Sequence, residues 1–363
     1  MTEDSALMAR AVQSLRDRQH MDRRTFMRGF ALVGVIANLL LSGCDSESQR
    51  TAELIDTVAP TPTPRLRAAF SHLGLDTAWV RRGSETAKFL GRLLGIDVVS
   101  YDGQLSVDKQ RSDLEAIAEQ HWDFVAIHPL AVNAYIEPVR KLIGNGIPVI
   151  DMDTRLADDL DGLGIVSFLE PDNLWMGEQV TTTIIEAARR AAQSDAFDIV
   201  HTQGVLTHTG AQGRARGFHN AIERYPKVRI VDETPGEWDV DKTTRLWEGL
   251  LERYPNVRAA FFHNDEMALA AQRVIAKAHK QKQIMVGGVD GLVDACAAVG
   301  HGDMVVTVMN PTGRIHSGAL WIGYFLAMRG ELENVPRFIR IDGGVVNKDT
   351  AAGYQWLGDH LLI

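Results

Sequence analysis

The sequence predicts an α/β protein made of two doubly wound lobes, each built on its own parallel sheet. Three observations lead to this fold class. The chain has 363 residues, 45% of them hydrophobic, which is enough for about two domains with a core in each. Short apolar runs alternate with longer segments of helical period. Runs of the first series also start about 24 to 31 residues apart, which is the size of a βαβ unit.

The first series of elements begins at residue 65. The apolar runs expected to form strands are 66–70, 97–100, 124–127 and 148–150. Segments of helical period lie between them, at 78–94, 107–120 and 133–143. Strands this short and continuously apolar are typical of a parallel sheet that helices cover on both faces.

A second series follows a further strand expected at 164–168. Its strands are predicted at 199–201, 228–232, 259–262, 284–289 and 304–309, and its helices at 174–192, 212–224, 242–253, 267–277 and 314–328. Asp76 and Asp172 precede helical segments and are expected to cap them, since acidic side chains accept from free N–H groups. In open sheets of this kind, ligands bind at the carboxyl ends of the strands.

The segment before the first lobe has the features of an export signal. Arg23 and Arg24 precede an apolar run over 30–41, which is too short to span a bilayer as a helix. The paired arginines resemble a twin-arginine signal, and the residues ending in Cys44 resemble a bacterial lipobox. We therefore expect residues 1–43 to be removed as a lipoprotein signal and Cys44 to be lipidated. The alternative is a short buried helix with a chance arginine pair. Residues 1–20 have no signal character, which leaves the true start open between Met1 and Met21.

Residues 44–64 are predicted to be the lipid anchor and a Pro-rich tether, because their Pro-Thr repeats favour extended conformations.

The composition excludes other classes of protein. The 47 acidic residues against 38 basic ones give a charge of −9, which argues against a nucleic-acid partner. The two cysteines cannot build a disulfide framework or a multi-cysteine metal site.

Signatures of catalysis and of metal binding are missing from the sequence. It contains no His-Glu-x-x-His spacing, nucleophile elbow or phosphate-binding loop. We therefore expect no enzyme activity, no cofactor and no metal site. Paired carboxylates leave a glycoside hydrolase as a remote alternative.

Planar polar side chains and two tryptophans gather at the predicted strand ends. They are Trp79, Asp153, Arg155, Arg214, Trp238, Asn264, Asp290 and Asn310. Carboxylates, amides and a guanidinium can make bidentate hydrogen bonds to neighbouring hydroxyls. Indole rings can cover the apolar face of a sugar ring. This is chemistry for an uncharged polyol.

Residues 65–349 resemble the periplasmic sugar-binding proteins of the ribose, xylose and galactose type, also called type I periplasmic binding proteins. The matching motifs are Ile147-Pro148-Val149-Ile150 with Asp153, Arg214 with Gly217-Phe218, Asn264-Asp265-Glu266-Met267-Ala268, and Val286-Gly287-Gly288-Val289-Asp290-Gly291. The resemblance implies that Asp153, Arg214, Asn264, Asp290 and Asn310 hydrogen-bond the ligand. It also places Trp79 and Trp238 at the aromatic stacking positions of the family.

Two departures from the family pattern leave the particular sugar open. Asp76-Thr77-Ala78-Trp79 stands where the commoner run is Asn-Pro-aromatic. Thr154 separates Asp153 from Arg155, so the resemblance does not decide whether Arg155 reaches the ligand.

The resemblance further implies a three-crossing hinge, with crossings near 168–172, 310–311 and 330–335. The first lobe would then hold 65–168 and 311–330, the second 172–309 and 335–349, and 350–363 would be a C-terminal tail. The expected protein is a monomeric, membrane-anchored, extracytoplasmic lipoprotein that presents a monosaccharide-like ligand to an ABC permease. A sensory receptor serving a histidine kinase or chemoreceptor is the alternative. A repressor core is disfavoured, because the export signal occupies the place of a DNA-binding domain.

Overall fold

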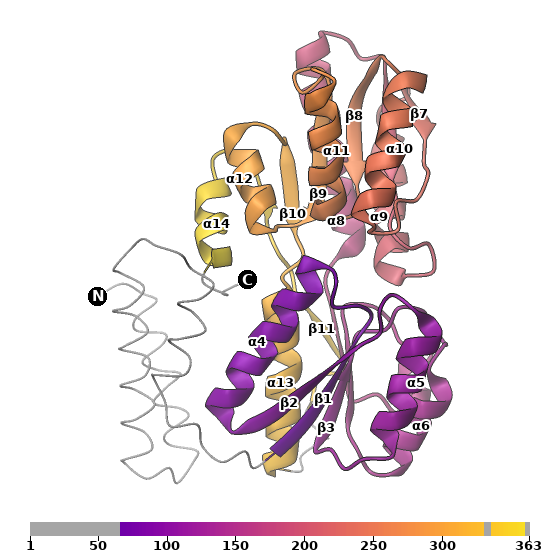
Figure 1. The fold of residues 1–363 in the computed structure, drawn as a ribbon, viewed down its shortest axis with the longest axis vertical. Helices are drawn as coiled ribbons and strands as arrows, with labels where there is room; N and C mark the ends of the chain where they lie inside the picture. The colour runs from indigo at the N-terminus through magenta and orange to yellow at the C-terminus, as the bar shows by residue number, and fades with distance from the viewer. Residues whose placement is uncertain (1–65, 330–334, 360–363) are drawn as a thin grey trace, which may run out of the picture. The chain divides into compact units, whose positions relative to one another are not determined.

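The computed structural model describes residues 66–329 and 335–359. The predicted signal, including Arg23 and Arg24, and the predicted lipidation site Cys44 with its tether lie outside the described residues. Within them, the chain forms the two α/β lobes that the apolar pattern predicts, each with a six-stranded sheet (Figure 1).

The first lobe is built on a sheet in the strand order β11-β5-β4-β3-β1-β2, paired in parallel throughout. Its strands are β1 (Leu66–His72), β2 (Ile96–Asp102), β3 (Phe124–Ile127), β4 (Val149–Met152), β5 (Ser167–Glu170) and β11 (Phe338–Arg340). Its helices are α4 (Ala78–Leu94), α5 (Val107–Ala118), α6 (Ile136–Gly144), α7 (Leu160–Leu163) and α13 (Thr312–Arg329). Two buried apolar clusters pack against the sheet, one around Phe70 and Phe124 and the other around Leu114 and Trp122.

The second lobe repeats this plan in the order β12-β10-β9-β8-β6-β7, with β12 antiparallel. Its strands are β6 (Phe197–Thr202), β7 (Val228–Asp232), β8 (Val257–Phe262), β9 (Met285–Asp290), β10 (Val306–Met309) and β12 (Val345–Val346). Its helices are α8 (Asn173–Ala192), α9 (Thr209–Ile222), α10 (Val240–Arg253), α11 (Asp265–Lys277), α12 (Val293–His301) and α14 (Ala351–Asp359). The predicted fold class is confirmed, and residues 351–359 of the expected tail form a helix that packs against α12.

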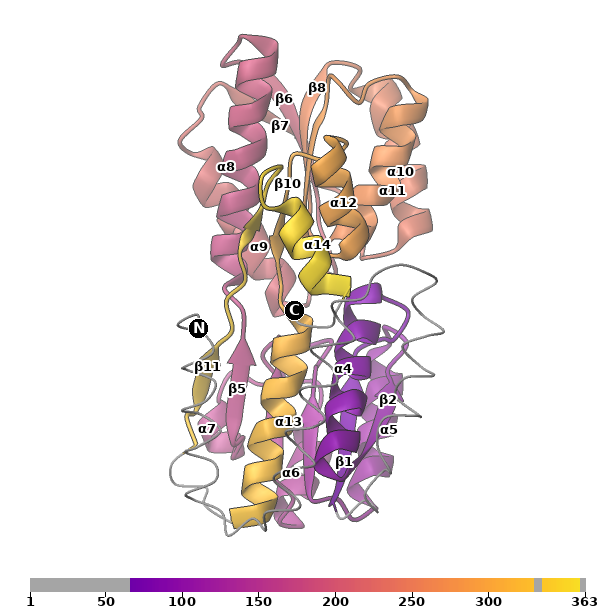
Figure 2. The ribbon, with the colours of Figure 1, turned by 90° about the vertical axis from the view of Figure 1, so that its left-hand side faces the viewer.

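The chain crosses between the sheets at three places. It passes from β5 to α8, from β10 to α13, and from β11 to β12. Figure 2 shows α13 returning to the first lobe, beside α4. The third crossing was predicted near 330–335, and that prediction is wrong: residues 338–340 form β11, which pairs with β5, so the crossing follows Arg340. β11 is a three-residue edge strand with Phe338 exposed, and a pattern this short carries little sequence signal.

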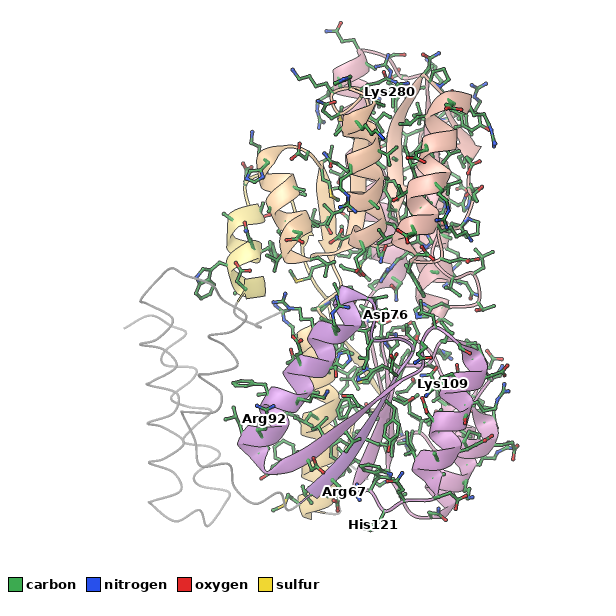
Figure 3. The ribbon with its side chains drawn as sticks, viewed as in Figure 1. Arg67, Asp76, Arg92, Lys109, His121 and Lys280 are labelled. Carbon is green, nitrogen blue, oxygen red and sulfur yellow. The ribbon has the colours of Figure 1, made fainter. Side chains whose placement is uncertain are left out.

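The two predicted helix caps, Asp172 and Asp76, have different outcomes in the structure. Asp172 caps α8, as predicted, by accepting from the N–H of Trp175 at 2.9 Å. The expected cap at Asp76 is wrong, because Thr77 takes that place and accepts from the N–H of Val80. Asp76 is exposed, as are Arg92 and His121 elsewhere on the first lobe (Figure 3).

Across the described residues, no helix combines the length and apolar character needed to cross a bilayer.

Candidate functional site

Asp153 and Asn310 meet where the two lobes join. Asp153 follows β4 with a φ of 61°, and Asn310 follows β10 at the second crossing. The Asn310 Nδ2 donates to Asp153 Oδ1 at 2.9 Å, while His128 Nε2 lies 3.2 Å from Asp153 Oδ2. Asn310 Oδ1 is buried without a hydrogen-bond partner. A buried polar atom left unpaired is costly, so this oxygen indicates a place for a donor from a ligand.

The carboxyl of Asp153 is held in its ionised form. Burial alone would raise its pKa, but the close approach of His128 and the charge of Arg214 lower the pKa below its usual range. An ionised carboxylate accepts stronger hydrogen bonds than a neutral group does. Asp153 is therefore a strong acceptor facing the second lobe.

Arg214 contributes a buried guanidinium from α9. Its Nε donates to Asn173 Oδ1 at 3.0 Å, and its Nη1 donates to the carbonyl oxygen of His263. Its Nη2 lies 3.8 Å from Asp290 Oδ1. With two of its donor groups held by the protein, the guanidinium is fixed in direction before a ligand arrives.

Asp290 ends β9 with a φ of 128° and is 7% exposed. Burial raises the pKa of Asp290 well above its usual value, Arg214 acts against that rise, and Asp265, Glu266 and Asp153 add to it. Asp265 supports this end of the strand by accepting from the N–H of Leu292 at 2.9 Å and from the Thr307 hydroxyl at 2.8 Å. Ionising Asp290 in this buried place is therefore costly, and a hydrogen-bond donor on a ligand would stabilise its carboxylate form.

Two indoles frame these polar groups. Trp79, 6% exposed, donates from Nε1 to the carbonyl oxygen of Asn310 at 2.8 Å. Trp238 has a φ of 61°, and its ring centroid lies 4.6 Å from that of His208. Trp238 packs against apolar clusters of both lobes. The structure thus brings Trp79 and Trp238 to the junction where the sequence predicts them.

Asn264 and Arg155 are placed differently from the other predicted residues. Asn264 is buried, and its Oδ1 caps α11 by accepting from the N–H of Met267 at 3.1 Å, which leaves the amide nitrogen for a ligand. The guanidinium of Arg155 donates to the carbonyl oxygen of Asp158 at 3.2 Å and lies 5.9 Å from the centre of the Phe168 ring. The structure therefore does not bring the Arg155 side chain to the other candidates.

Sequence reasoning missed two histidines at this junction. His128 follows β3 and is 2% exposed; His208 precedes α9 and is 4% exposed. Their ring centroids lie 5.8 Å apart. The position of His128 at a strand end was an available signal, whereas the loop that carries His208 gave none. Burial lowers the pKa of His208 to about 3, so its ring is neutral.

Comparison with known proteins identifies this two-lobed arrangement. The family described as periplasmic binding protein domain matches residues 69–331. The chain belongs to this family. The resemblance predicted from the motifs is confirmed, and membership places the chain among binding proteins, not among enzymes.

Two curated relatives illustrate the similarity. The D-allose-binding periplasmic protein of Escherichia coli strain K12 is 25% identical over 281 residues, covering 74% of this chain and 88% of the relative. The ribose import binding protein RbsB of Bacillus subtilis strain 168 is 30% identical over 214 residues, covering 59% of this chain and 66% of the relative.

Solved structures agree with the family assignment. One is the binding protein of the arabinose ABC transporter from Shewanella sp. ANA-3, bound to L-arabinofuranose. It is 27% identical, with a TM-score of 0.72, and the match covers 80% of this chain and 95% of that one. A galactofuranose-binding protein has a TM-score of 0.76 at 20% identity and covers 82% of this chain and 100% of that one, which supports the fold alone.

Proposed function

We propose that this chain is a lipid-anchored, extracytoplasmic solute-binding protein that captures a monosaccharide or similar polyol between its lobes and presents it to an ABC importer. The relatives support the ligand class, since they are named for allose and ribose binding. The structure supports it through one observation: acceptors and donors from both lobes converge at a buried junction framed by Trp79 and Trp238.

The charges at this junction suit a neutral ligand rich in hydroxyls. Asp153 accepts, Arg214 donates, and the free Oδ1 of Asn310 accepts. Each sugar hydroxyl can donate one hydrogen bond and accept others, so adjacent hydroxyls satisfy acceptors and donors together. The indole faces would cover the C–H surface of the ring.

Capture works by stabilising the closed arrangement of the lobes. The N–H of Ala78 on α4 donates to Glu266 Oε2 on α11 at 3.1 Å, and the N–H of Arg155 donates to Thr209 Oγ1 at 3.1 Å. A ligand that contacts both lobes favours the closed arrangement, because only in that arrangement can it reach the polar groups of both lobes at once. A micromolar dissociation constant corresponds to about −8 kcal/mol, within reach of several hydrogen bonds and ring contacts.

A ligand screen tests the proposal. The protein is titrated with pentoses, hexoses and polyols while tryptophan fluorescence is followed. We expect a saturable change for at least one sugar, lost in Asp153→Asn and retained in Asp108→Asn, which alters a side chain 92% exposed on α5. A flat response to every compound would contradict sugar capture.

Export and anchoring are tested separately, because they rest on the sequence motifs alone. Replacing Cys44 with Ser should release the protein from the membrane into the extracytoplasmic fraction. Replacing Arg23 and Arg24 with Lys should retain it in the cytoplasm. Membrane association that survives Cys44→Ser would overturn the lipid anchor and leave sugar binding unaffected.

Uptake measurements separate import from sensing. Cells lacking the gene are supplied with the radiolabelled sugar that the screen identifies. Loss of uptake, restored by the gene, supports an importer. Normal uptake with a lost transcriptional or chemotactic response to that sugar would instead favour the sensory alternative.

A further inference from the structure

Three metal-ligating side chains meet at the junction of the lobes. His128 and Asp153 come from the first lobe and His208 from the second, and their ligand atoms lie within 4.8 Å of one another. Their exposed fractions are 2%, 3% and 4%. These residues lie far apart in the chain, so a search for short spacings such as His-Glu-x-x-His could not detect the group.

Both imidazoles have unused ring nitrogens. Neither ring nitrogen of His208 has a hydrogen-bond partner, although both are buried. The contact of His128 with this group is the 3.2 Å approach of its Nε2 to Asp153 Oδ2, and its Nδ1 is likewise without a partner. Leaving such groups buried and unpaired costs free energy. A bound group that accepts a lone pair from an imidazole nitrogen would offset that cost.

The negative charge at this junction comes from buried carboxylates. Asp153, Asp265 and Asp290 are at most 7% exposed, and Asp265 and Asp153 both act electrostatically on Asp290. Arg214 is the buried cation beside them, 3.8 Å from Asp290. Sugar hydroxyls would supply hydrogen bonds here but no positive charge. A divalent ion would stabilise the ionised carboxylate of Asp153 directly.

We propose that His128, Asp153 and His208 bind a divalent transition-metal ion of the Zn²⁺ class and so link the two lobes. Two imidazoles and one carboxylate form a ligand set that Zn²⁺, Co²⁺ and Ni²⁺ accept, with a coordination position left open. Asp153 can serve through Oδ2, because Oδ1 is occupied by Asn310. This proposal differs from the sequence-based expectation of no metal site, and it goes beyond sugar capture because the protein alone supplies the ligands.

Metal titration of the chelator-treated protein tests the proposal. Zn²⁺ binding is measured calorimetrically, and Co²⁺ serves as a spectroscopic probe of nitrogen and oxygen ligation. We expect one tight site per chain, weakened about 100-fold or more in His128→Gln and in His208→Gln. Because the ligands lie on both lobes, Zn²⁺ should also reduce the radius of gyration of the wild type and leave that of His208→Gln unchanged.

A second group provides the matched control. His201, His219 and Glu233 could also hold a metal ion, and His219 is half exposed. His219→Gln should keep the tight site. Loss of that site in His219→Gln, or unchanged Zn²⁺ affinity in both junction variants, would overturn the proposal. Circular dichroism and thermal melting show that each variant is folded, and sugar titration in chelator tests the proposed function independently of the metal.

Discussion

The Nδ2 of Asn310 donates a 2.9 Å hydrogen bond to Oδ1 of Asp153, 157 positions earlier in the chain. Asn310 stands at the crossing from β10 to α13, and its carbonyl oxygen also accepts from Trp79 Nε1 at 2.8 Å. Asn310, at the crossing between the lobes, thus holds both the Asp153 carboxylate and the Trp79 indole of the candidate site. Any change in the backbone of this crossing would therefore move two groups of the candidate site.

Asn310→Ala should weaken sugar binding more than it weakens folding. The variant removes a bond to a buried carboxylate and the free Oδ1, but it keeps the backbone acceptor for Trp79. Hydrogen bonds to charged groups contribute about 1.5–3 kcal/mol, so we expect affinity to fall about 10- to 100-fold. Calorimetric titration measures it. Asn220→Ala is the control and should keep the affinity of the wild type, because it removes only an exposed 3.3 Å bond from Asn220 Nδ2 on α9 to Glu178 Oε1 on α8.

Glu170 at the end of β5 should make stability depend on pH. Burial, with a further contribution from Asp153, raises the pKa of Glu170 from 4.5 to about 7. Between these values the folded state binds more protons than the unfolded state, so the free energy of unfolding falls as pH rises. In Glu170→Gln, urea unfolding across this range should show a smaller fall. Glu115→Gln, on the exposed face of α5, should follow the wild type; matching profiles in all three proteins would contradict the assignment.

Glu266→Ala should loosen the contact between the lobes. Glu266 Oε2 accepts from the N–H of Ala78 at the start of α4, and losing one such bond costs about 0.5–1.5 kcal/mol. We expect sugar affinity to fall about three- to tenfold, with a larger radius of gyration in small-angle X-ray scattering of the ligand-free protein. Glu248→Ala removes an exposed carboxylate of α10 and should change neither quantity. A Glu266→Ala protein with wild-type scattering and affinity would show that this bond does not hold the lobes.

Part of the candidate site could be predicted from the sequence by a rule of sheet geometry. Carboxyl ends of parallel strands meet at one edge, so Asp290 and Asn310, at the ends of β9 and β10 in one sheet, could be grouped. Asp153 follows β4 of the other sheet, and only the family resemblance joined it to them. The approach of His208 to His128 was out of reach, since it depends on how two separate lobes face each other. The direction of the Arg155 side chain was also undecided, because its partners Asp158 and Phe168 are tertiary contacts. Edge strand β11 escaped detection because it has three residues, two of them exposed, which are too few to establish a period.

Gly204→Ala should displace Trp238 and thereby reduce sugar affinity. A Cβ atom at Gly204 would lie 2.4 Å from Nε1 and 2.5 Å from Cε2 of the Trp238 indole, distances that the ring can relieve only by moving. The backbone N–H of Gly204 is also held by His263 Nδ1 at 3.0 Å, so the main chain cannot easily retreat. Overpacking of this kind costs about 1–3 kcal/mol, and we expect calorimetric titration to show affinity reduced about tenfold or more. Gly249→Ala is the matched control: it lies in α10, and apart from its chain neighbours and the backbone of its own helix no atom lies within 4 Å of its Cβ position. It should keep the affinity and raise the free energy of unfolding by about 0.5–1 kcal/mol, as expected for Gly to Ala in a helix. Equal affinities in the two glycine variants would show that the indole position is not used to bind the ligand.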